Sequence, residues 1–209
     1  MMNISLVAIS DKKVEKLVRD TLKFNKKATF KFALEKYEDS ILIANNYWIF
    51  RISEVSFPLT LETIKQKLAT IGYSDNEKVA IKKEADKEVM PYHMNKSLKE
   101  IINRNTVDFK ESTLTRYIFN LAGCYLRIIL NDSEVILFDE DYVEVLKDLS
   151  INRYKLYTAG VINPLVIYDT EFDRNEGLIM PVKLSRQADY DDIKSRFIVE
   201  EDEDNEAEV

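Results

Sequence analysis

An order of amphipathic helices and short apolar strands that occurs twice along the chain constrains the fold more than any single motif. In the first half, helical spacing of apolar residues over 11–24 and 61–70 alternates with strand-like runs. In the second half, helical patterns over 95–104 and 139–149 alternate with strand patterns in the same order. The sequence therefore predicts an α+β fold made of two similar units.

Landmarks that keep their order in both halves support the repeat. Phe57 precedes the second helical pattern of the first half, as Phe138 precedes that of the second half. Val89-Met-Pro91 likewise corresponds to Ile179-Met-Pro181. We expect tandem domains over 1–93 and 94–186, each with two helices packed on antiparallel sheets.

Local signals give the expected strands and their boundaries. Asn45 and Asn46 predict a tight turn because asparagine tolerates positive φ. Ser10 or Asp11 is expected to cap the first helix, and Thr60 the second. The expected strands cover 29–34, 41–44, 47–52, 78–82, 88–92, 114–121, 125–130, 134–138, 154–158, 165–168 and 178–184.

Residues 187–209 are expected to form a polar segment that leads into a disordered acidic tail. Residues 200–209 hold seven acids and no base, whereas the net charge of the whole chain is −7. The rest of the chain is therefore neutral, and a nucleic-acid partner would need local segregation of charge. The tail could keep the protein in solution, imitate nucleic-acid charge, or cover a basic surface of the same molecule.

The expected cellular compartment follows from sequence features that the chain lacks. No apolar run approaches the roughly 20 residues of a membrane-spanning helix. The first residues lack the basic segment and cleavage site of a signal peptide. Cys124 is the single cysteine and cannot form an internal disulfide. We expect a cytoplasmic protein with no membrane partner.

Catalytic residues are hard to assign, so we expect a protein that is not an enzyme and uses no metal or cofactor. His93 is the single histidine, which excludes a site with several histidine ligands and suggests a structural role. Cys124, in an apolar run, is interpreted as a small buried residue. Four glycines leave no phosphate-binding loop.

A few side chains keep other chemistry open. The acidic pairs Asp139/Asp141 and Asp191/Asp192 could bind a hard cation for hydrolysis, but helix capping explains the first and a polar segment holds the second. Tyr47 and Trp48 could stack on a base, although one of two neighbours in an alternating strand normally lies in the core.

The end of the second half resembles the end of a DNA polymerase sliding clamp. The motifs that carry the resemblance are a helix signature, a proline-started strand and a last strand with Met-Pro-Val, namely Phe138, Tyr142, Leu146 and Leu149, then Pro164–Ile167, then Leu178–Leu184. Such clamps are rings of six similar domains whose helices line the hole and whose sheets continue across each joint. For a chain of two domains, the resemblance implies a homotrimer.

The resemblance also implies contacts to the phosphates of double-stranded DNA from basic residues on the lining helices. The candidates are Lys12, Lys13, Lys16, Arg19, Lys65, Lys67, Lys96, Lys99 and Arg104. Alternatively, these side chains form ordinary solvated helix faces. The predicted fourth helix departs from the family, since Lys147 is its only base against Asp139, Glu140, Asp141, Glu144 and Asp148.

The last strand gives a second implied site. In bacterial clamps, peptides of polymerases and clamp loaders bind near the C-terminal strand. The corresponding residues are Met180, Pro181, Val182 and Leu184, which could instead fill the core. Pro181 predicts a sheet edge or a bulge there, because proline lacks a donor.

Together these features predict a processivity factor for DNA replication, a clamp-like scaffold that encircles DNA and tethers its partners. The alternative is an α+β interaction or regulatory module that forms no ring, as a monomer or dimer with an acidic tail. The lysine-, asparagine- and isoleucine-rich composition suits a low-GC bacterium or its phage.

Overall fold

A computed structural model describes residues 3–4, 6–23, 27, 29–73, 79–84, 86–91, 95–104, 108–131, 134–147 and 153–197. The helices of these residues are α1 (Asp11–Thr21), α2 (Pro58–Thr70), α3 (Leu98–Ile102), α4 (Glu140–Val143) and α5 (Gln187–Ser195). The strands are β1 (Asn3–Ile4), β2 (Leu6–Ile9), β3 (Phe30–Tyr37), β4 (Ser40–Ala44), β5 (Trp48–Ser53), β6 (Val79–Lys83), β7 (Met90–Pro91), β8 (Lys110–Leu121), β9 (Cys124–Asn131), β10 (Glu134–Asp139), β11 (Leu146–Lys147), β12 (Tyr154–Thr158), β13 (Leu165–Asp169) and β14 (Arg174–Ile179).

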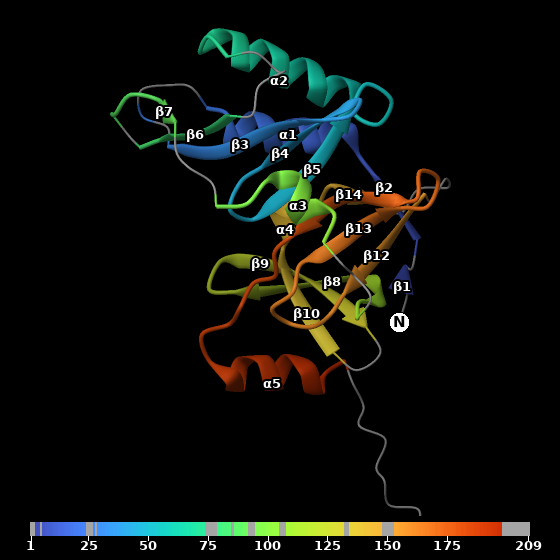
Figure 1. Ribbon diagram of the computed structural model, residues 1–209. Coiled ribbons are helices and arrows are strands. Elements are labelled where there is room, and N and C mark those ends of the chain that lie inside the picture. Colours follow the sequence, from blue (N-terminus) through green and yellow to red (C-terminus); the bar gives the residue numbers. More distant parts are fainter. Residues whose placement is uncertain are drawn as a thin grey trace, which may run out of the picture.

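Antiparallel pairing joins these strands into one sheet (Figure 1). Its order is β10-β9-β8-β12-β13-β14-β5-β4-β3-β6-β7, with β1 on β8 and β2 on β11 and β12. The predicted α+β class is therefore confirmed.

The sheet continues across the predicted domain boundary. β14 pairs with β5, where Gly177 lies opposite Phe50. The approach is close, because a Cβ on Gly177 would lie 2.8 Å from a ring carbon of Phe50. The first strands also cross the boundary, since β1 and β2 pair with strands of the second half. The division into two clamp-type domains stays a prediction.

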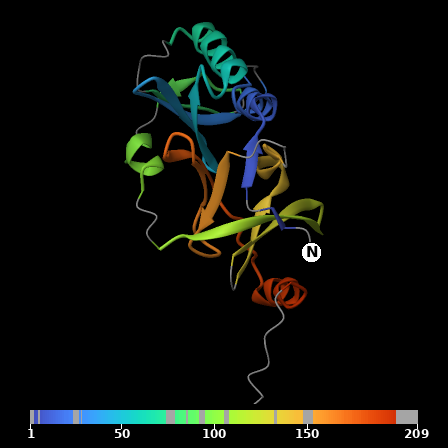
Figure 2. The same ribbon diagram turned by 90° about the vertical axis from the view of Figure 1, so that its right-hand side faces the viewer.

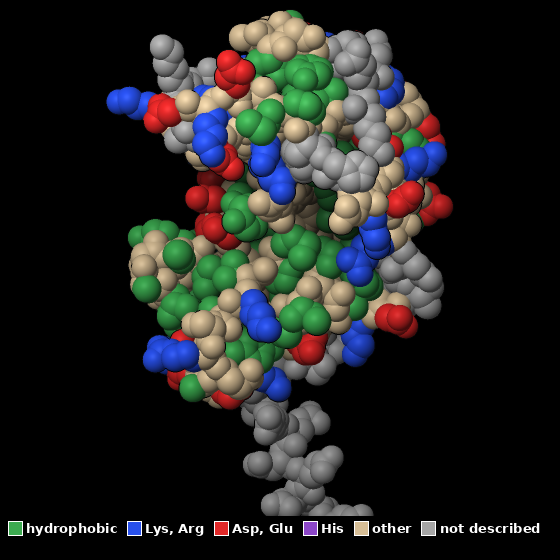
Figure 3. All heavy atoms as spheres, turned by 60° about the vertical axis from the view of Figure 1, so that its left-hand side comes forward, with side chains coloured by type: hydrophobic (Ala, Val, Ile, Leu, Met, Phe, Trp, Pro, Cys, Tyr) green, Lys and Arg blue, Asp and Glu red, His purple; other side chains and the backbone are tan. Residues whose placement is uncertain are grey.

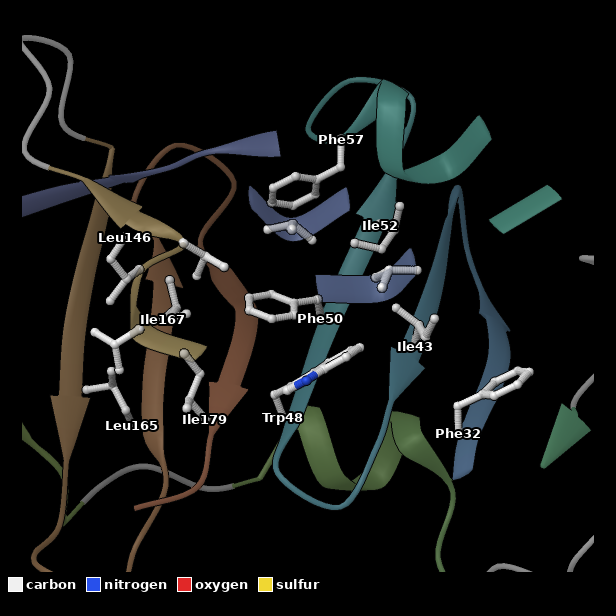
Figure 4. Close-up of a cluster of buried hydrophobic side chains, with 14 of the residues drawn as sticks. Phe32, Ile43, Trp48, Phe50, Ile52, Phe57, Leu146, Leu165, Ile167 and Ile179 are labelled. Carbon is white, nitrogen blue, oxygen red and sulfur yellow. The ribbon is translucent and has the colours of Figure 1, made fainter. Parts of the chain in front are cut away.

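Alternating side chains give the sheet two apolar faces. On β4, Ile41 and Ile43 join the larger core cluster, which includes Val14 and Val18 of α1 and Ile64 and Leu68 of α2. Leu42 and Ala44 point the other way and pack with Leu98 and Ile102 of α3. Figure 2 shows α1 and α2 on one side of these strands and α3 on the other. The larger cluster also includes side chains of β13 and β14 (Figure 4).

The helix starts differ from the expected caps. Ser10 precedes α1 but makes no side-chain cap bond, and α2 begins at Pro58, before Thr60. Asp11 caps α2 instead of its own helix, since its carboxylate accepts from the backbone N–H groups of Leu59 (2.9 Å) and Thr60 (3.2 Å). The two helix N-termini therefore lie together.

The predicted turn at Asn45 and Asn46 is confirmed, but its reason was wrong. Neither residue is among the described residues with positive φ. The Asn45 side-chain oxygen instead accepts from the backbone N–H groups of Tyr47 (2.8 Å) and Trp48 (3.0 Å). These two hydrogen bonds close the turn.

The helices predicted for the second half are shorter than their patterns. α3 covers five residues of the expected 95–104. The helix over 139–149 ends at Val143, and Leu146 belongs to β11, where it lies opposite Ile9 of β2. The strand pairing and burial of Leu146 therefore determine its conformation more strongly than its helical spacing does. Residues 148–150 lie outside the described residues, as do the tail residues 198–209 and Tyr92–Met94 with His93.

Two further expectations need correction, one for the last strand and one for Cys124. The last strand ends at Ile179 and not at Leu184, because Pro181 has no N–H for the ladder. Residues 187–195 form α5, whose Ile193 is buried against β10. Cys124 is exposed beside a hairpin turn and not buried.

No helix in the part of the chain that the structure describes has the length and hydropathy to cross a membrane.

Candidate nucleic-acid interface

Three hollows meet at the β4–β5 turn. Their volumes are about 290, 600 and 500 Å³, and Asn45 lines all three. Seven cationic side chains from α1, β3, β6 and the two ends of α3 surround this turn. We call these residues the basic end: Lys13, Lys16, Lys31, Lys82, Lys83, Lys96 and Arg104.

The hollow of about 600 Å³ lies between α3 and the sheet. Lys31, Lys96 and Arg104 line it together with apolar residues, and no Asp or Glu is among its described lining residues. Figure 3 brings this side of the molecule forward and shows Lys and Arg side chains beside the central hollow. A cationic rim over an apolar floor suits an anionic ligand that also has flat apolar surface.

Strand pairing brings the lysines of β3 and β6 together. Lys31 lies directly opposite Lys82, and Lys83 lies opposite Phe30. Like charges at opposite positions are unfavourable by themselves, and an anion would offset that cost. The nearby Glu84 carboxyl forms an ion pair with Lys87, and its hydrogen bond to Lys87 and the charges of Lys87 and Lys82 lower its pKa.

An aromatic pair stands beside the lysines. Tyr47 stacks on Tyr142 with ring centroids 5.5 Å apart, and it remains 52% exposed. Burial, followed by the charge of Asp139, raises the pKa of Tyr142 to about 12, so this ring stays neutral. Trp48 is 2% exposed, which confirms that one of these two neighbouring aromatics lies in the core. Tyr47 therefore offers a flat surface next to Lys82 and Lys83.

The structure brings only some of the predicted DNA-binding residues together. Lys13, Lys16, Lys96 and Arg104 belong to the basic end. The other predicted residues line none of its hollows, namely Lys12, Arg19, Lys65, Lys67 and Lys99. Lys99 lies over the Tyr37 ring, and Arg19 bonds Glu15.

The helices that carry these residues do not share one surface. α1 and α2 cover one face of the sheet, whereas α3 covers the opposite face. One inner surface made of all three helices, as in a ring, therefore cannot contain every candidate. Around the β4–β5 turn, cations from both faces approach each other.

Ion pairs neutralise part of the acidic surface around α4. In the sequence, these acids argued against a DNA-lining surface there. Glu144 pairs with Lys13, and Glu140 pairs with Arg127. Asp139 caps α4 by accepting from the N–H of Asp141, as the capping interpretation predicted. The first pair also reduces the charge that Lys13 can offer to a ligand.

The predicted peptide-binding residues are divided between two hollows. Met180 is 42% exposed and lines the hollow beside α3. Val182 and Leu184 line a separate hollow of about 250 Å³ near α5, and the Val182 N–H bonds the Leu137 carbonyl of β10. Pro181 lines neither hollow. These residues do not form one continuous groove.

Sequence reasoning missed Lys31, Lys82 and Lys83. The Lys82-Lys83 pair is visible in the sequence, but its position opposite Lys31 depends on the register between β3 and β6. Elsewhere, no group of three or more metal-ligating side chains occurs within the described ranges.

A scan against protein-family models and searches of curated proteins and solved structures found no match to this chain.

Proposed function

We propose that this protein is a non-enzymatic, DNA-binding accessory protein that contacts the phosphates of double-stranded DNA through its basic end. The observation that carries the proposal is the meeting of seven cations from separate elements around one turn, of which Lys83 alone is largely buried, at 8% exposed. Lysine and arginine contacts to phosphate supply most of the sequence-independent affinity for DNA.

The acids among the same lining residues weaken this argument little. Of the four acids that line these hollows, Asp20, Glu84 and Glu144 are engaged by Lys23, Lys87 and Lys13. Asp141, the fourth, has no ion pair within the described residues and adds one negative charge beside Lys13 and Lys16. Lys16, Lys82 and Lys96 form no ion pair within the described residues and are available to phosphates. Tyr47 adds a surface on which a base or sugar can pack.

Binding of a labelled duplex, measured by fluorescence anisotropy over a series of salt concentrations, tests the proposal. We expect Lys82→Gln and Lys96→Gln each to weaken binding and to reduce the slope of log K against log salt by about 0.9. Lys36→Gln is the matched control, because it removes one exposed lysine of β3 that lies outside the basic end and is not a predicted DNA contact. Equal binding by all these variants would sink the proposal.

The sliding clamp is the more specific form of this proposal, with a homotrimer encircling DNA and tethering polymerase or clamp-loader peptides. The sheet that continues from β14 to β5 supports it, and the position of α3 opposite α1 and α2 does not. The interaction module without a ring remains the alternative.

DNA topology separates the two forms. A ring should be retained on circular DNA and lost when the DNA is linearised, with a trimer mass in light scattering. The DNA binding of a ring should also weaken when Lys12→Gln or Lys99→Gln removes a lysine outside the basic end. Retention that does not depend on topology, together with a smaller mass, would leave a plain DNA-binding module.

A further inference from the structure

The β8–β9 hairpin extends beyond the strands that hold its base. β8 pairs with β12 at Lys110–Ser112 and with β1 at Leu114 and Thr115, and β10 pairs with β9 from Leu126 onward. We call residues 116–125 the hairpin arm. Within the described residues, the outer edge of Ile118–Leu121 has no partner strand.

The hairpin arm is apolar and almost uncharged. Its only charged residue is Arg116. Tyr117, Ile118 and Tyr125 are 46%, 48% and 58% exposed. In Figure 3 a mainly hydrophobic projection stands out at the left. Proteins normally protect such a strand edge with lysine, proline or a covering element.

A sharp turn holds the arm in strand conformation. Ala122 and Gly123 both have positive φ (51° and 89°), as a two-residue hairpin loop of this twist requires. The Asn120 side-chain oxygen accepts from the Gly123 N–H at 3.0 Å. The edge is therefore a preformed template for one more strand.

We propose that this edge pairs with the same edge of a second copy of the chain, giving a two-fold symmetric dimer. Its partner must be an extended strand with few charges, and the arm itself has that chemistry. A two-fold axis at Phe119 places Ile118 of each copy opposite Asn120 of the other. Arg116 then lies opposite Ala122, so no like charges meet, and the two Phe119 rings become cross-strand neighbours.

The proposal is independent of DNA binding and differs from a ring, in which each subunit offers two different edges. The interface is small, so we expect a weak dimer with a dissociation constant in the micromolar range.

Sedimentation of the full chain over a concentration series tests the pairing. We expect the wild type to dimerise reversibly and Ile118→Lys to weaken the dimer at least about tenfold, since it places a charge on the apolar seam. Val55→Lys is the matched control, because Val55 is a 73% exposed apolar residue on the turn after β5. It should dimerise as the wild type does.

Hydrogen exchange supplies the second readout. The amides of Ile118–Leu121 should exchange more slowly at high than at low concentration in the wild type, and not in Ile118→Lys. A wild type that stays monomeric, or a dimer that Ile118→Lys leaves unchanged, would overturn the proposal.

Discussion

Glu176 illustrates how a single buried group couples the two halves of the sheet. Its side chain is fully buried, and its carboxylate lies 4.0 Å from Arg51, which is 2% exposed, and 3.3 Å from Arg174. One carboxylate oxygen of Glu176 and one guanidinium nitrogen of Arg51 have no hydrogen-bond partner in the described part of the molecule. Burial raises the pKa of Glu176 above its ordinary value of 4.5, although both arginines oppose the shift.

This raised pKa predicts a pH-dependent stability. A carboxyl that binds its proton more tightly when folded stabilises the fold fully below the unfolded pKa, near 4.5. That contribution is lost as pH rises through the folded pKa. Glu176→Gln removes it, so the free energy of unfolding of the variant minus that of the wild type should increase as pH rises from the unfolded pKa through the folded pKa, and level off above it. Urea unfolding at several pH values measures it, with the exposed Glu54→Gln as control, and a constant difference would contradict it.

At the scale of elements, α1 and α2 stabilise each other at their N-termini. Asp11 accepts from two backbone N–H groups of α2 and from the Thr60 hydroxyl at 2.6 Å. Glu15 of α1 accepts from the Thr63 hydroxyl of α2 at 3.0 Å. The first-turn donors of α2 are thus satisfied by a side chain 48 positions earlier in the chain.

Removing the Asp11 carboxylate should lower the free energy of unfolding more than removing the Ser10 hydroxyl, which precedes α1. We expect Asp11→Ala to lower the free energy of unfolding by about 1–2 kcal/mol, because it leaves the α2 donors without an acceptor. Ser10→Ala should cost less than about 0.5 kcal/mol, since the Ser10 side chain makes no cap bond. Urea denaturation compares them. Equal losses would mean that Asp11 does not act as a cap.

At the scale of the whole molecule, the β5–β14 seam joins the halves into one sheet. The core cluster passes across it, since Phe50 and Ile52 belong to the same cluster as Ile167 and Ile179 (Figure 4). A shared core and a shared sheet favour cooperative unfolding of both halves together.

Gly177→Ala tests this coupling, because its new Cβ would meet the Phe50 ring at 2.8 Å. We expect a loss of about 1–3 kcal/mol from overpacking. Trp48 fluorescence, which reports β5 at the seam opposite Ile179, and far-UV circular dichroism, which reports all elements, should shift to the same new midpoint. Two separated transitions would show instead that the halves unfold as independent domains.

Periodic apolar spacing was enough to predict the α+β class and the existence of most strands, because burial on one face needs only local alternation. β4, β5, β9 and β10 lie close to their expected positions. Local spacing failed where a distant strand competed for the same residues. Leu146 has helical spacing, but pairing with Ile9 makes it a strand.

The sequence by itself determined which residues are cationic, apolar or turn-forming, since these are properties of side chains and local backbone. Only the tertiary structure decided which of them meet. The register of β3 against β6 sets Lys31 beside Lys82, and the alternation of β4 sends α3 to the face opposite α1 and α2. A one-residue change of register would reverse which side chains share a face. The candidate site therefore follows from strand pairing between residues far apart in the chain.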